Sequence, residues 1–350
     1  MTSAANRIKV LIVDDSAIVR KILSETISAE PDMEVVGTAP DPYIARDKIL
    51  SLQPDVLTLD IELPRMDGLT FLKKLMLYHP MPVIVISSLG HSSCEASIEA
   101  LRCGAVEVLA KPAGPYSIGE LSANLTAKLR AAANARVRKG NAGGSSAQPR
   151  QPVTSGSFRQ DAIIAIGAST GGTEAIRQVL VQLPSTAPGI VVTQHIPPVF
   201  SAAFANRLNQ LCAFEVKEAT DGDVVKPGRA LVAPGNFHML LRRVGNTFRV
   251  QVRGGPQVCY QRPSVDVMFA SVAEAAGNNA VGALLTGMGS DGAQGLLRMK
   301  RAGAKTVAQD EETCIVYGMP REAVKLGAVD QVLPLSEIAP ALLRQVSPAS

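Results

Sequence analysis

The sequence predicts two α/β domains, each built on a parallel β-sheet with helices on both faces. The chain has 350 residues, of which 46% are hydrophobic and 19% charged, and this length and composition fit about two globular units. In both halves, short apolar runs alternate with segments of helical periodicity, as a parallel sheet covered on both faces requires. A polar, Gly/Ser/Pro-rich stretch separates the halves.

The first half alternates five times between strand and helix. We expect strands at the apolar runs Ile8–Val13, Glu34–Thr38, Asp55–Leu59, Pro82–Ser87 and Val106–Ala110. We expect helices to start at Ser16, at Asp41, after Gly68, at Cys94 and at Ser117. The predicted first domain covers residues 1–130.

Residues 131–160 are predicted to form a flexible basic linker. Most residues from 140 to 160 are Gly, Ser, Pro or Gln, so they cannot bury enough apolar surface to offset the entropy of ordering. The whole segment holds basic residues and no acid, and the chain has a formal net charge of only +4. The excess charge therefore lies in a solvated tether rather than on a nucleic-acid-binding face. Contact of the tether with a receptor or another acidic surface is an open alternative.

The second half, residues 161–350, resumes the alternation and contains a β-rich insertion. We expect strands at Ala162–Ile166, Ile190–Gln194, Ala280–Leu285 and Lys305–Ala308, with the insertion at Phe214–Arg253. We expect helices from Thr173, Pro198 and Val265, another after Asp291, and two more after the last strand.

Composition excludes several classes of protein. The five Cys are an odd number without a C-x-x-C pair, and none of the four His has a His or Cys partner at ligand spacing, which argues against a disulfide framework and a structural zinc site. No apolar run approaches the length of about 18 residues of a membrane helix. With no targeting segment expected at the polar start, the sequence indicates a cytoplasmic protein.

Acidic side chains, a hydroxyl and a lysine lie where strands of the first domain should end. Asp14 and Asp15 follow the first strand, Asp60 follows the third, Ser87 ends the fourth and Lys111 follows the fifth. Because the carboxyl ends of parallel strands line one crevice, these groups should converge, and clustered carboxylates suit Mg²⁺. The alternative, acids that only cap helices, suits Asp15 but does not explain Asp60 together with Lys111.

Over residues 7–130 this set resembles the receiver domain of two-component response regulators, which has a flavodoxin-like fold. The resemblance implies that Asp60 is the phosphoacceptor and that Asp14, Asp15 and Asp60 hold Mg²⁺. It also implies that Ser87 and Lys111 contact the phosphoryl group.

One position departs from the receiver pattern. Members usually carry an aromatic residue three places before the lysine, where this chain has Val108, so an aromatic switch is not expected here. Phosphorylation would add a charge of about −1.5 to −2 and new acceptor oxygens, which makes this domain an input module.

The second domain begins with a strand, a tight turn and a helix around Ser169. Gly167–Gly171 matches G-x-S-x-G, which places a serine at a helix N-terminus where free N–H groups favour a developing anion. The rival reading is a dinucleotide fingerprint, because Gly167 and Gly172 have the outer spacing of G-x-G-x-x-G. Against it, Ser169 would obstruct the pyrophosphate, and the next strand ends in His195 rather than in an acid for the ribose.

His195 and Asp291 end two further strands and complete a candidate hydrolytic site. Asp291 alone could be a helix N-cap, but a hydroxyl, an imidazole and a carboxylate at one crevice form the set of a Ser-His-Asp hydrolase. Their order along the chain differs from that of α/β-hydrolases. His238, beside Asn236 in the β-rich stretch, is interpreted as a surface or packing residue.

With a receiver in front, the segments GASTGG, QHIPP and TGMGSDG resemble those of the chemotaxis-specific protein-glutamate methylesterases, the CheB family, across the whole chain except the linker and termini. The resemblance implies a Rossmann-like α/β hydrolytic domain with Ser169 as nucleophile, His195 as general base and Asp291 as its orienting acid. It places Thr170 and Met288 near the oxyanion site.

The resemblance further implies hydrolysis of glutamate γ-methyl esters on methyl-accepting chemoreceptors, with glutamine deamidation as a candidate second activity. Ester hydrolysis would need no cofactor. A histidine kinase of the chemotaxis system would phosphorylate Asp60, no nucleic acid would be bound, and membranes would be met only through receptors. Two other classes stay open, a receiver joined to a non-catalytic binding module and a nucleotide-dependent enzyme.

Overall fold

The computed structural model describes residues 7–88, 90–111, 118–135 and 158–348. The chain divides into two compact units, residues 1–144 and 145–350. Most of the predicted linker lies outside the described residues. Its described ends are not linker-like, since residues 131–133 belong to a helix and Phe158 is buried in the second unit.

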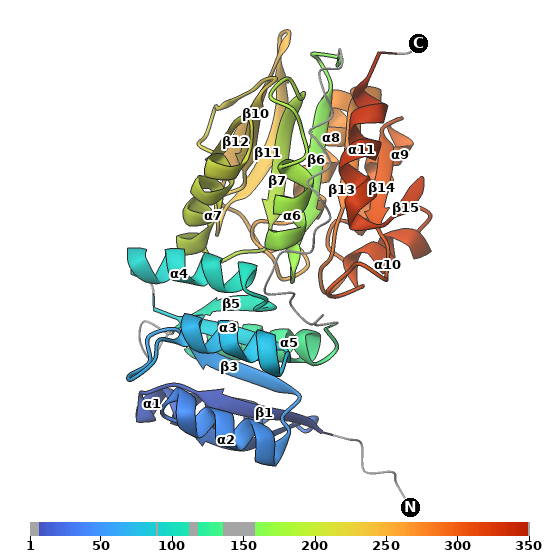
Figure 1. Cartoon of the computed structure of the whole chain (residues 1–350). Helices are drawn as coiled ribbons and strands as arrows, with labels where there is room; N and C mark the ends of the chain where they lie inside the picture. Colours follow the sequence, from blue (N-terminus) through green and yellow to red (C-terminus); the bar gives the residue numbers. More distant parts are fainter. Residues whose placement is uncertain (1–6, 89, 112–117, 136–157, 349–350) are drawn as a thin grey trace, which may run out of the picture. The chain divides into compact units, whose positions relative to one another are not determined.

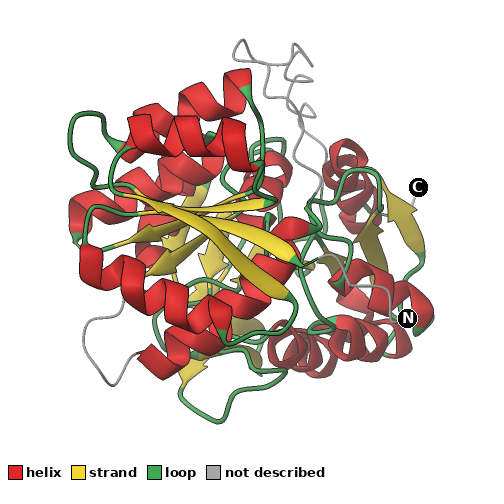
Figure 2. Ribbon diagram, turned by 90° about the horizontal axis from the view of Figure 1, so that it is seen from below, coloured by secondary structure: helices red, strands yellow, loops and turns green. Residues whose placement is uncertain are grey.

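The first unit is a five-stranded parallel sheet with helices on both faces, as predicted (Figures 1 and 2). The strand order is β2-β1-β3-β4-β5. The strands are β1 (Ile8–Val13), β2 (Met33–Ala39), β3 (Val56–Asp60), β4 (Val83–Ser87) and β5 (Glu107–Ala110), and the helices are α1 (Ala17–Ser28), α2 (Pro42–Leu52), α3 (Gly68–Tyr78), α4 (His91–Arg102) and α5 (Ile118–Ala133).

Local sequence explains where several of these elements begin. Ser16, Asp41 and Asp67 cap α1, α2 and α3 by accepting backbone N–H groups of the first turn. Helix α4 begins at His91, before the predicted start at Cys94. The sequence did not indicate this first turn because it is polar and has no side-chain cap. The predicted start of α5 at Ser117 lies outside the described residues.

The second unit contains a seven-stranded parallel sheet of order β15-β14-β13-β6-β7-β10-β8 and a three-stranded antiparallel sheet of order β11-β12-β9. Its strands are β6 (Ile163–Ala168), β7 (Gly189–Gln194), β8 (Glu215–Glu218), β9 (Val224–Val225), β10 (Arg229–Val232), β11 (His238–Val244), β12 (Thr247–Arg253), β13 (Ala280–Leu284), β14 (Lys305–Gln309) and β15 (Gln331–Leu333). Its helices are α6 (Gly172–Leu180), α7 (Pro198–Leu211), α8 (Val265–Ala276), α9 (Ala293–Arg301), α10 (Met319–Lys325) and α11 (Leu335–Val346), with a short 3-10 turn at Gly277–Asn279.

The β-rich stretch is only partly an insertion. β8 and β10 extend the parallel sheet beyond β7, whereas β9, β11 and β12 form the separate small sheet. The prediction also missed β15, which lies between the last two helices. This edge strand has three residues, two of them exposed, so its sequence lacks the apolar run that would have marked it.

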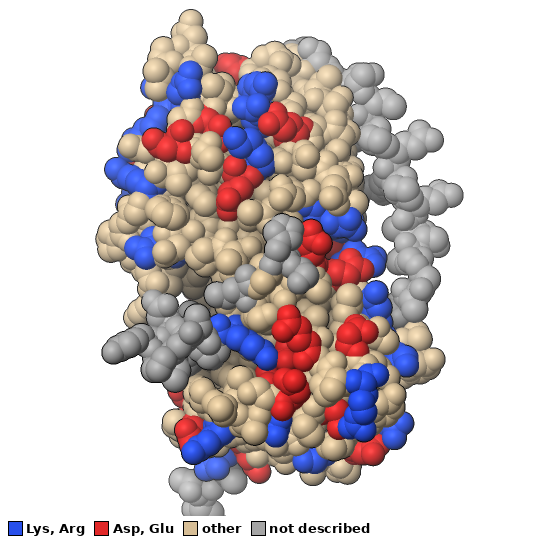
Figure 3. All heavy atoms as spheres, turned by 90° about the vertical axis from the view of Figure 1, so that its left-hand side faces the viewer, with Lys and Arg blue, Asp and Glu red and all other residues tan. Residues whose placement is uncertain are grey.

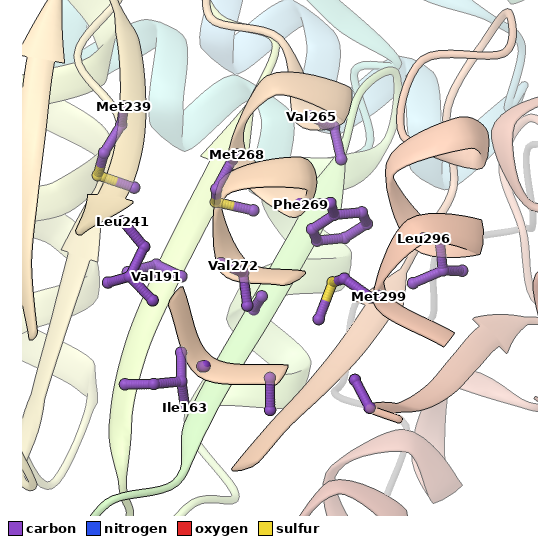
Figure 4. Close-up of a cluster of buried hydrophobic side chains, with 14 of the residues drawn as sticks. Ile163, Val191, Met239, Leu241, Val265, Met268, Phe269, Val272, Leu296 and Met299 are labelled. Carbon is purple, nitrogen blue, oxygen red and sulfur yellow. The ribbon is translucent and has the colours of Figure 1, made fainter. Parts of the chain in front are cut away.

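Helix α8 lies on an apolar core shared by both sheets. Figure 4 shows Val265, Met268, Phe269 and Val272 of α8 packed among side chains of the neighbouring strands and of α9. Burial of one large apolar side chain contributes about 1.5–3 kcal/mol, so this face fixes the helix and with it the direction of its N-terminus.

Charge is interspersed on the surface of the described residues. On the face shown in Figure 3, basic and acidic side chains lie next to one another in both units. Among the described residues, no helix has both the length and the apolar character that crossing a membrane requires.

Candidate functional site

The acids of the first unit converge at the carboxyl ends of β1 and β3. Asp14, Asp15 and Asp60 each offer a carboxylate oxygen, and these oxygens lie within 4.8 Å of one another. Lys111 Nζ donates to Asp60 Oδ2 at 2.7 Å and lies 3.0 Å from Asp14 Oδ2. The structure therefore brings together four of the residues that the sequence singled out.

Burial and the hydrogen bonds between Lys111 and the carboxylates shift the pKa values of these groups in opposite directions. Burial raises the pKa of Asp60, and the hydrogen bond from Lys111 offsets this only in part, so the pKa lies above the ordinary value. Burial lowers the pKa of Lys111, but the hydrogen bonds to Asp60 and Asp14 outweigh it and the pKa is raised. The ammonium is thus held charged beside the carboxylates.

The geometry of the carboxylates fits a divalent cation. Asp14 Oδ2 is buried with Lys111 Nζ as its charged neighbour at 3.0 Å, and Asp15 is exposed beside it. Ser16, not Asp15, caps α1, so the helix-capping alternative for Asp15 is wrong. Oxygen ligands from three carboxylates suit Mg²⁺.

Ser87 and Val108 occupy neighbouring strands beside this cluster. Ser87 ends β4, and its hydroxyl lies 3.4 Å from the carbonyl of Ser88 and 3.5 Å from that of Ser93. No hydrogen bond joins it to Asp60 in the described residues. Val108 is buried in β5, paired with Val85 of β4.

Glu62 belongs to this site but was missed by the sequence reasoning. Its backbone N–H donates to Asp60 Oδ1 at 3.0 Å, and its carboxylate accepts from the hydroxyls of Ser88, at 2.8 Å, and Ser93. The hydrogen bonds from Ser93 and Ser88 lower the pKa of Glu62. Only its position two residues after Asp60 could have indicated it.

In the second unit, Ser169 lies in the turn between β6 and α6. Gly172 N–H donates to the Ser169 carbonyl at 2.7 Å, and Gly171 has a φ of 76°, which a residue with a side chain rarely adopts. Gln194 Nε2 donates to the same carbonyl at 2.8 Å. This tight turn fixes the serine at the helix start.

The neighbouring strand ends enclose Ser169 from both sides. Its N–H donates to the Thr286 carbonyl at 3.0 Å, beyond the end of β13, and the adjacent Ala168 carbonyl accepts from His195 N–H at 3.1 Å, beyond the end of β7. A Cβ on Gly287 would lie 2.7 Å from Ser169 Cβ. The backbone at Gly287 approaches the serine so closely that any side chain at this position would clash with it.

His195 and Asp291 are directly bonded. His195 Nε2 lies 2.7 Å from Asp291 Oδ2, and both side chains are buried. His195 Nδ1 is buried and has no hydrogen-bond partner among the described residues. The ring thus binds the acid through Nε2 and keeps Nδ1 available, while the bond between Ser169 and the ring is not formed in this structure.

The carboxylate of Asp291 lies against the N-terminus of α8. Val265 N–H donates to its Oδ2 at 2.7 Å, and Asp266 N–H and the Ser264 hydroxyl donate to its Oδ1 at 3.0 and 2.8 Å. Burial raises the pKa of Asp291, but the hydrogen bonds from His195, Asp266 and Ser264 outweigh it and the pKa lies below the ordinary value. Its own following helix, α9, is capped by Gly292, so the N-cap alternative for Asp291 is wrong.

Thr170 and Met288 flank Ser169 along the chain and across the sheet. Thr170 is the next residue, and its carbonyl accepts from the Thr286 hydroxyl at 3.0 Å. Met288 follows Gly287 and is 37% exposed, and its N–H makes no hydrogen bond within the described residues.

The structure corrects the interpretation of His238. Its side chain is 5% exposed, which excludes the surface reading and leaves packing. Its ring also makes two hydrogen bonds, to Ser264 N–H and to the Pro256 carbonyl. Like Gln194, it acts on a backbone group far away in sequence, so no local motif could have indicated its contacts.

Family models match both units. The model described as CheB methylesterase matches residues 164–342, and the response regulator receiver domain matches residues 10–122.

Relatives match over the whole length. A protein-glutamate methylesterase/protein-glutamine glutaminase 2 from Syntrophus aciditrophicus is 56% identical and covers 97% of this chain and 100% of its own. A protein-glutamate methylesterase/protein-glutamine glutaminase from Salmonella typhi is 50% identical over 98% of each chain. The crystal structure of the Thermotoga maritima CheB methylesterase catalytic domain is 37% identical, covers 53% of this chain and 98% of its own, and has a TM-score of 0.52.

The order of the two units, the serine turn of the second and the full-length identity to these relatives agree, and the chain belongs to the CheB methylesterase family.

Proposed function

We propose that this protein hydrolyses glutamate γ-methyl esters on methyl-accepting chemoreceptors by acyl transfer through Ser169, His195 and Asp291. The observation that carries the proposal is the bond of 2.7 Å between His195 Nε2 and Asp291 Oδ2, which leaves the buried Nδ1 of the ring unpartnered at the strand end beside Ser169. A base held by an acid at the strand end next to a serine at a helix start is the arrangement of a nucleophilic hydrolase.

In the first half-reaction, Ser169 Oγ attacks the ester carbonyl and its proton passes to His195 Nδ1. Asp291 stabilises the positive ring that forms. The ring then returns the proton to the leaving oxygen, so that methanol departs and the glutamyl group stays on Ser169 as an ester. A close approach of Ser169 to Nδ1 is needed only with substrate in place, and such bonds are often long without it.

In the second half-reaction, His195 takes a proton from water, which attacks the acyl carbonyl. The ring returns that proton to Ser169 Oγ as the ester bond breaks and the glutamate carboxylate leaves. The same two steps applied to a glutamine side chain release ammonia in place of methanol, so deamidation needs no additional residue. Ester hydrolysis in this scheme uses no cofactor.

The developing oxyanion requires N–H donors near Ser169. We assign this role to the backbone at Thr170 and Met288, the two oxyanion candidates. The Met288 N–H is uncommitted in the described residues, and its chain passes against Ser169 through Gly287. The exposed Met288 side chain would contact the substrate.

The first unit is proposed to regulate this reaction from Asp60. A histidine kinase of the chemotaxis system would supply the phosphoryl group, with Lys111 and Ser87 contacting it. Asp14, Asp15 and Asp60 would hold Mg²⁺, which neutralises the charge of the phosphoryl group during transfer. We infer that the unphosphorylated first unit restricts access to Ser169, and that the protein acts in the cytoplasm, meeting membranes only through receptors.

Covalent labelling with a serine-directed phosphonate tests the nucleophile. We expect a single adduct at Ser169, mapped by peptide mass spectrometry, and faster labelling after a small phosphodonor is added. The variant Ser169→Ala should not be labelled. Ser185→Ala, which removes an exposed serine, is the matched control and should be labelled like the unmodified protein.

The alternatives predict other outcomes of the same experiment. A receiver joined to a non-catalytic binding module would give no adduct at Ser169 under either condition. A nucleotide-dependent enzyme would bind a dinucleotide in calorimetry, which the proposed hydrolase would not.

A further inference from the structure

The position of Asp291 depends on three donors at one helix end. Two of them are backbone N–H groups of Val265 and Asp266, and the third is the hydroxyl of the N-cap residue Ser264. A small rotation of Ser264 would therefore move the carboxylate that orients His195. What fixes Ser264 matters for the reaction.

His238 is the side chain that fixes the backbone of Ser264. Its Nδ1 accepts the Ser264 N–H at 3.2 Å, and its Nε2 lies 2.9 Å from the carbonyl of Pro256. A carbonyl only accepts, so Nε2 carries the proton and Nδ1 is the acceptor. The ring is buried, and no water could replace it at the Ser264 N–H without a rearrangement.

A continuous set of hydrogen bonds thus leads from His238 through Ser264 to Asp291 and on to His195. Ser264 uses its N–H toward His238 and its hydroxyl toward Asp291 Oδ1 at 2.8 Å. Asp291 Oδ2 meets His195 Nε2 at 2.7 Å.

His238 is not the only residue of β11 that contacts α8. β11 and α8 are also joined by the Leu241 N–H, which donates to Ser271 Oγ at 2.8 Å. Figure 4 shows Met239 and Leu241 of β11 beside the buried face of α8. The effect of His238 is therefore local to the N-terminal end of the helix.

We propose that His238 is a positioning residue for the hydrolytic reaction, which holds Asp291 in line with His195 by fixing the Ser264 backbone. This inference rests on the proposed function of Ser169, His195 and Asp291. It assigns to His238 a role that depends on one ring nitrogen, Nδ1, rather than on its volume.

Two amide substitutions test the contributions of the two ring nitrogens separately. The side-chain oxygen of Asn can take the place of Nδ1, so His238→Asn keeps the acceptor for Ser264 and loses the donor to Pro256. The amide of Gln reaches the place of Nε2, so His238→Gln keeps the donor and loses the acceptor. Both variants are polar and smaller than or similar to the ring, which makes them a matched pair.

Methanol release from methylated chemoreceptor, measured against pH, is the assay. We expect His238→Gln to lower kcat about tenfold, as loss of a supporting hydrogen bond behind a functional group does, with KM nearly unchanged. The acid limb of its profile of kcat against pH should move to lower pH, because a displaced carboxylate stabilises the protonated ring of His195 less. His238→Asn should keep most of kcat and the original acid limb. His79→Gln, at an exposed position of the first unit, controls for the substitution itself.

Equal behaviour of His238→Gln and His238→Asn in kcat and in the acid limb would overturn the proposal. If His238→Gln does not fold by circular dichroism, Ser264→Ala decides. It removes the hydroxyl that bonds Asp291 and should also lower kcat and move the acid limb, and unchanged values would overturn the proposal. Ser169→Ala tests the proposed function separately, because turnover without the hydroxyl contradicts the nucleophile whatever the His238 variants do.

Discussion

At the scale of single residues, two buried carboxylates have been tuned in opposite directions by their neighbours. Asp291 receives donors from a helix N-terminus and from His195, so its pKa is lowered despite burial. Asp60 has one strong partner in Lys111, and burial dominates, so its pKa is raised. The first suits a permanent anion, and the second suits the proposed role of Asp60 as a cation ligand and phosphoacceptor.

The raised pKa of Asp60 predicts how stability depends on pH. Below the ordinary carboxyl pKa near 3.8 the group is protonated in both the folded and the unfolded chain, and it has no effect on the free energy of unfolding. As the pH rises through the higher pKa of the folded state, the buried charge costs stability. Asp60→Asn should therefore stabilise the first unit at neutral pH without divalent cations, and the gain should vanish toward acid pH.

Hydrogen exchange of the β1 and β3 amides, recorded as a function of pH, measures the stability of the first unit alone. Asp47→Asn, on the exposed side of α2, controls for the loss of one charge. Added Mg²⁺ should narrow the difference between Asp60→Asn and the unmodified protein. A variant that is no more stable than the unmodified protein at neutral pH would contradict this account.

Site residues at strand ends could be predicted from the sequence, whereas the residues that hold them in position by hydrogen bonds could not. Asp60 and Lys111 follow buried runs, and the topology of a parallel sheet alone brings them together. Gln194 and His238 act through contacts with groups that no spacing rule links to them. Backbone donors such as Val265 N–H leave no sequence signal at all.

At the scale of elements, the site depends on how closely two turns approach each other. The turn after β13 passes Ser169 at Gly287, where a Cβ would meet Met319 Sδ at 2.3 Å and Ser169 Cβ at 2.7 Å. The turn after β6 is fixed by Gly171 and Gly172. The contact between the two turns requires glycine at position 287, whereas Gly171 is required by the left-handed backbone conformation of its own turn.

Gly287→Ala should displace Ser169. A misplacement of about 1 Å costs on the order of 100-fold in rate, and we expect a loss of kcat of this size, with a destabilisation of about 1–3 kcal/mol from overpacking. Gly254→Ala is the matched control, because nothing lies within 4 Å of its Cβ, and it should change neither quantity. Methanol release and urea denaturation measure both. Full activity of Gly287→Ala would show that the turn gives way without moving the serine.

The order of long elements was predictable, and pairing between distant segments was not. Buried runs such as β1 and β6 stand out because both faces of a parallel sheet are covered. β8 has one buried residue among four, and only its pairing with β10 places it in the main sheet. β15 escaped prediction for the same reason, since an exposed edge strand needs no apolar pattern.

At the scale of the whole molecule, the proposed phosphoacceptor Asp60 and the proposed hydrolytic site lie in separate compact units. The inference that the first unit restricts access to Ser169 predicts the effect of removing it. Deleting residues 1–140 should raise the rate of ester cleavage above that of the unphosphorylated full chain and abolish the response to a small phosphodonor.

The catalytic domain of the Thermotoga maritima relative has been crystallised separately, and it matches the second unit at 37% identity, so a truncated chain is a reasonable sample. Full-length Asp60→Asn is the control, which should stay at the basal rate with or without the phosphodonor. A truncated protein with an unchanged or lower rate would show that the first unit does not inhibit by restricting access.

Methanol release by Ser169→Ala from methylated chemoreceptor, beside the unmodified protein and with a small phosphodonor present, tests the central claim most directly. We predict ready release by the unmodified protein and none above background by the variant, with the same folded structure in both. Sustained release by the variant would contradict an acyl-enzyme on Ser169.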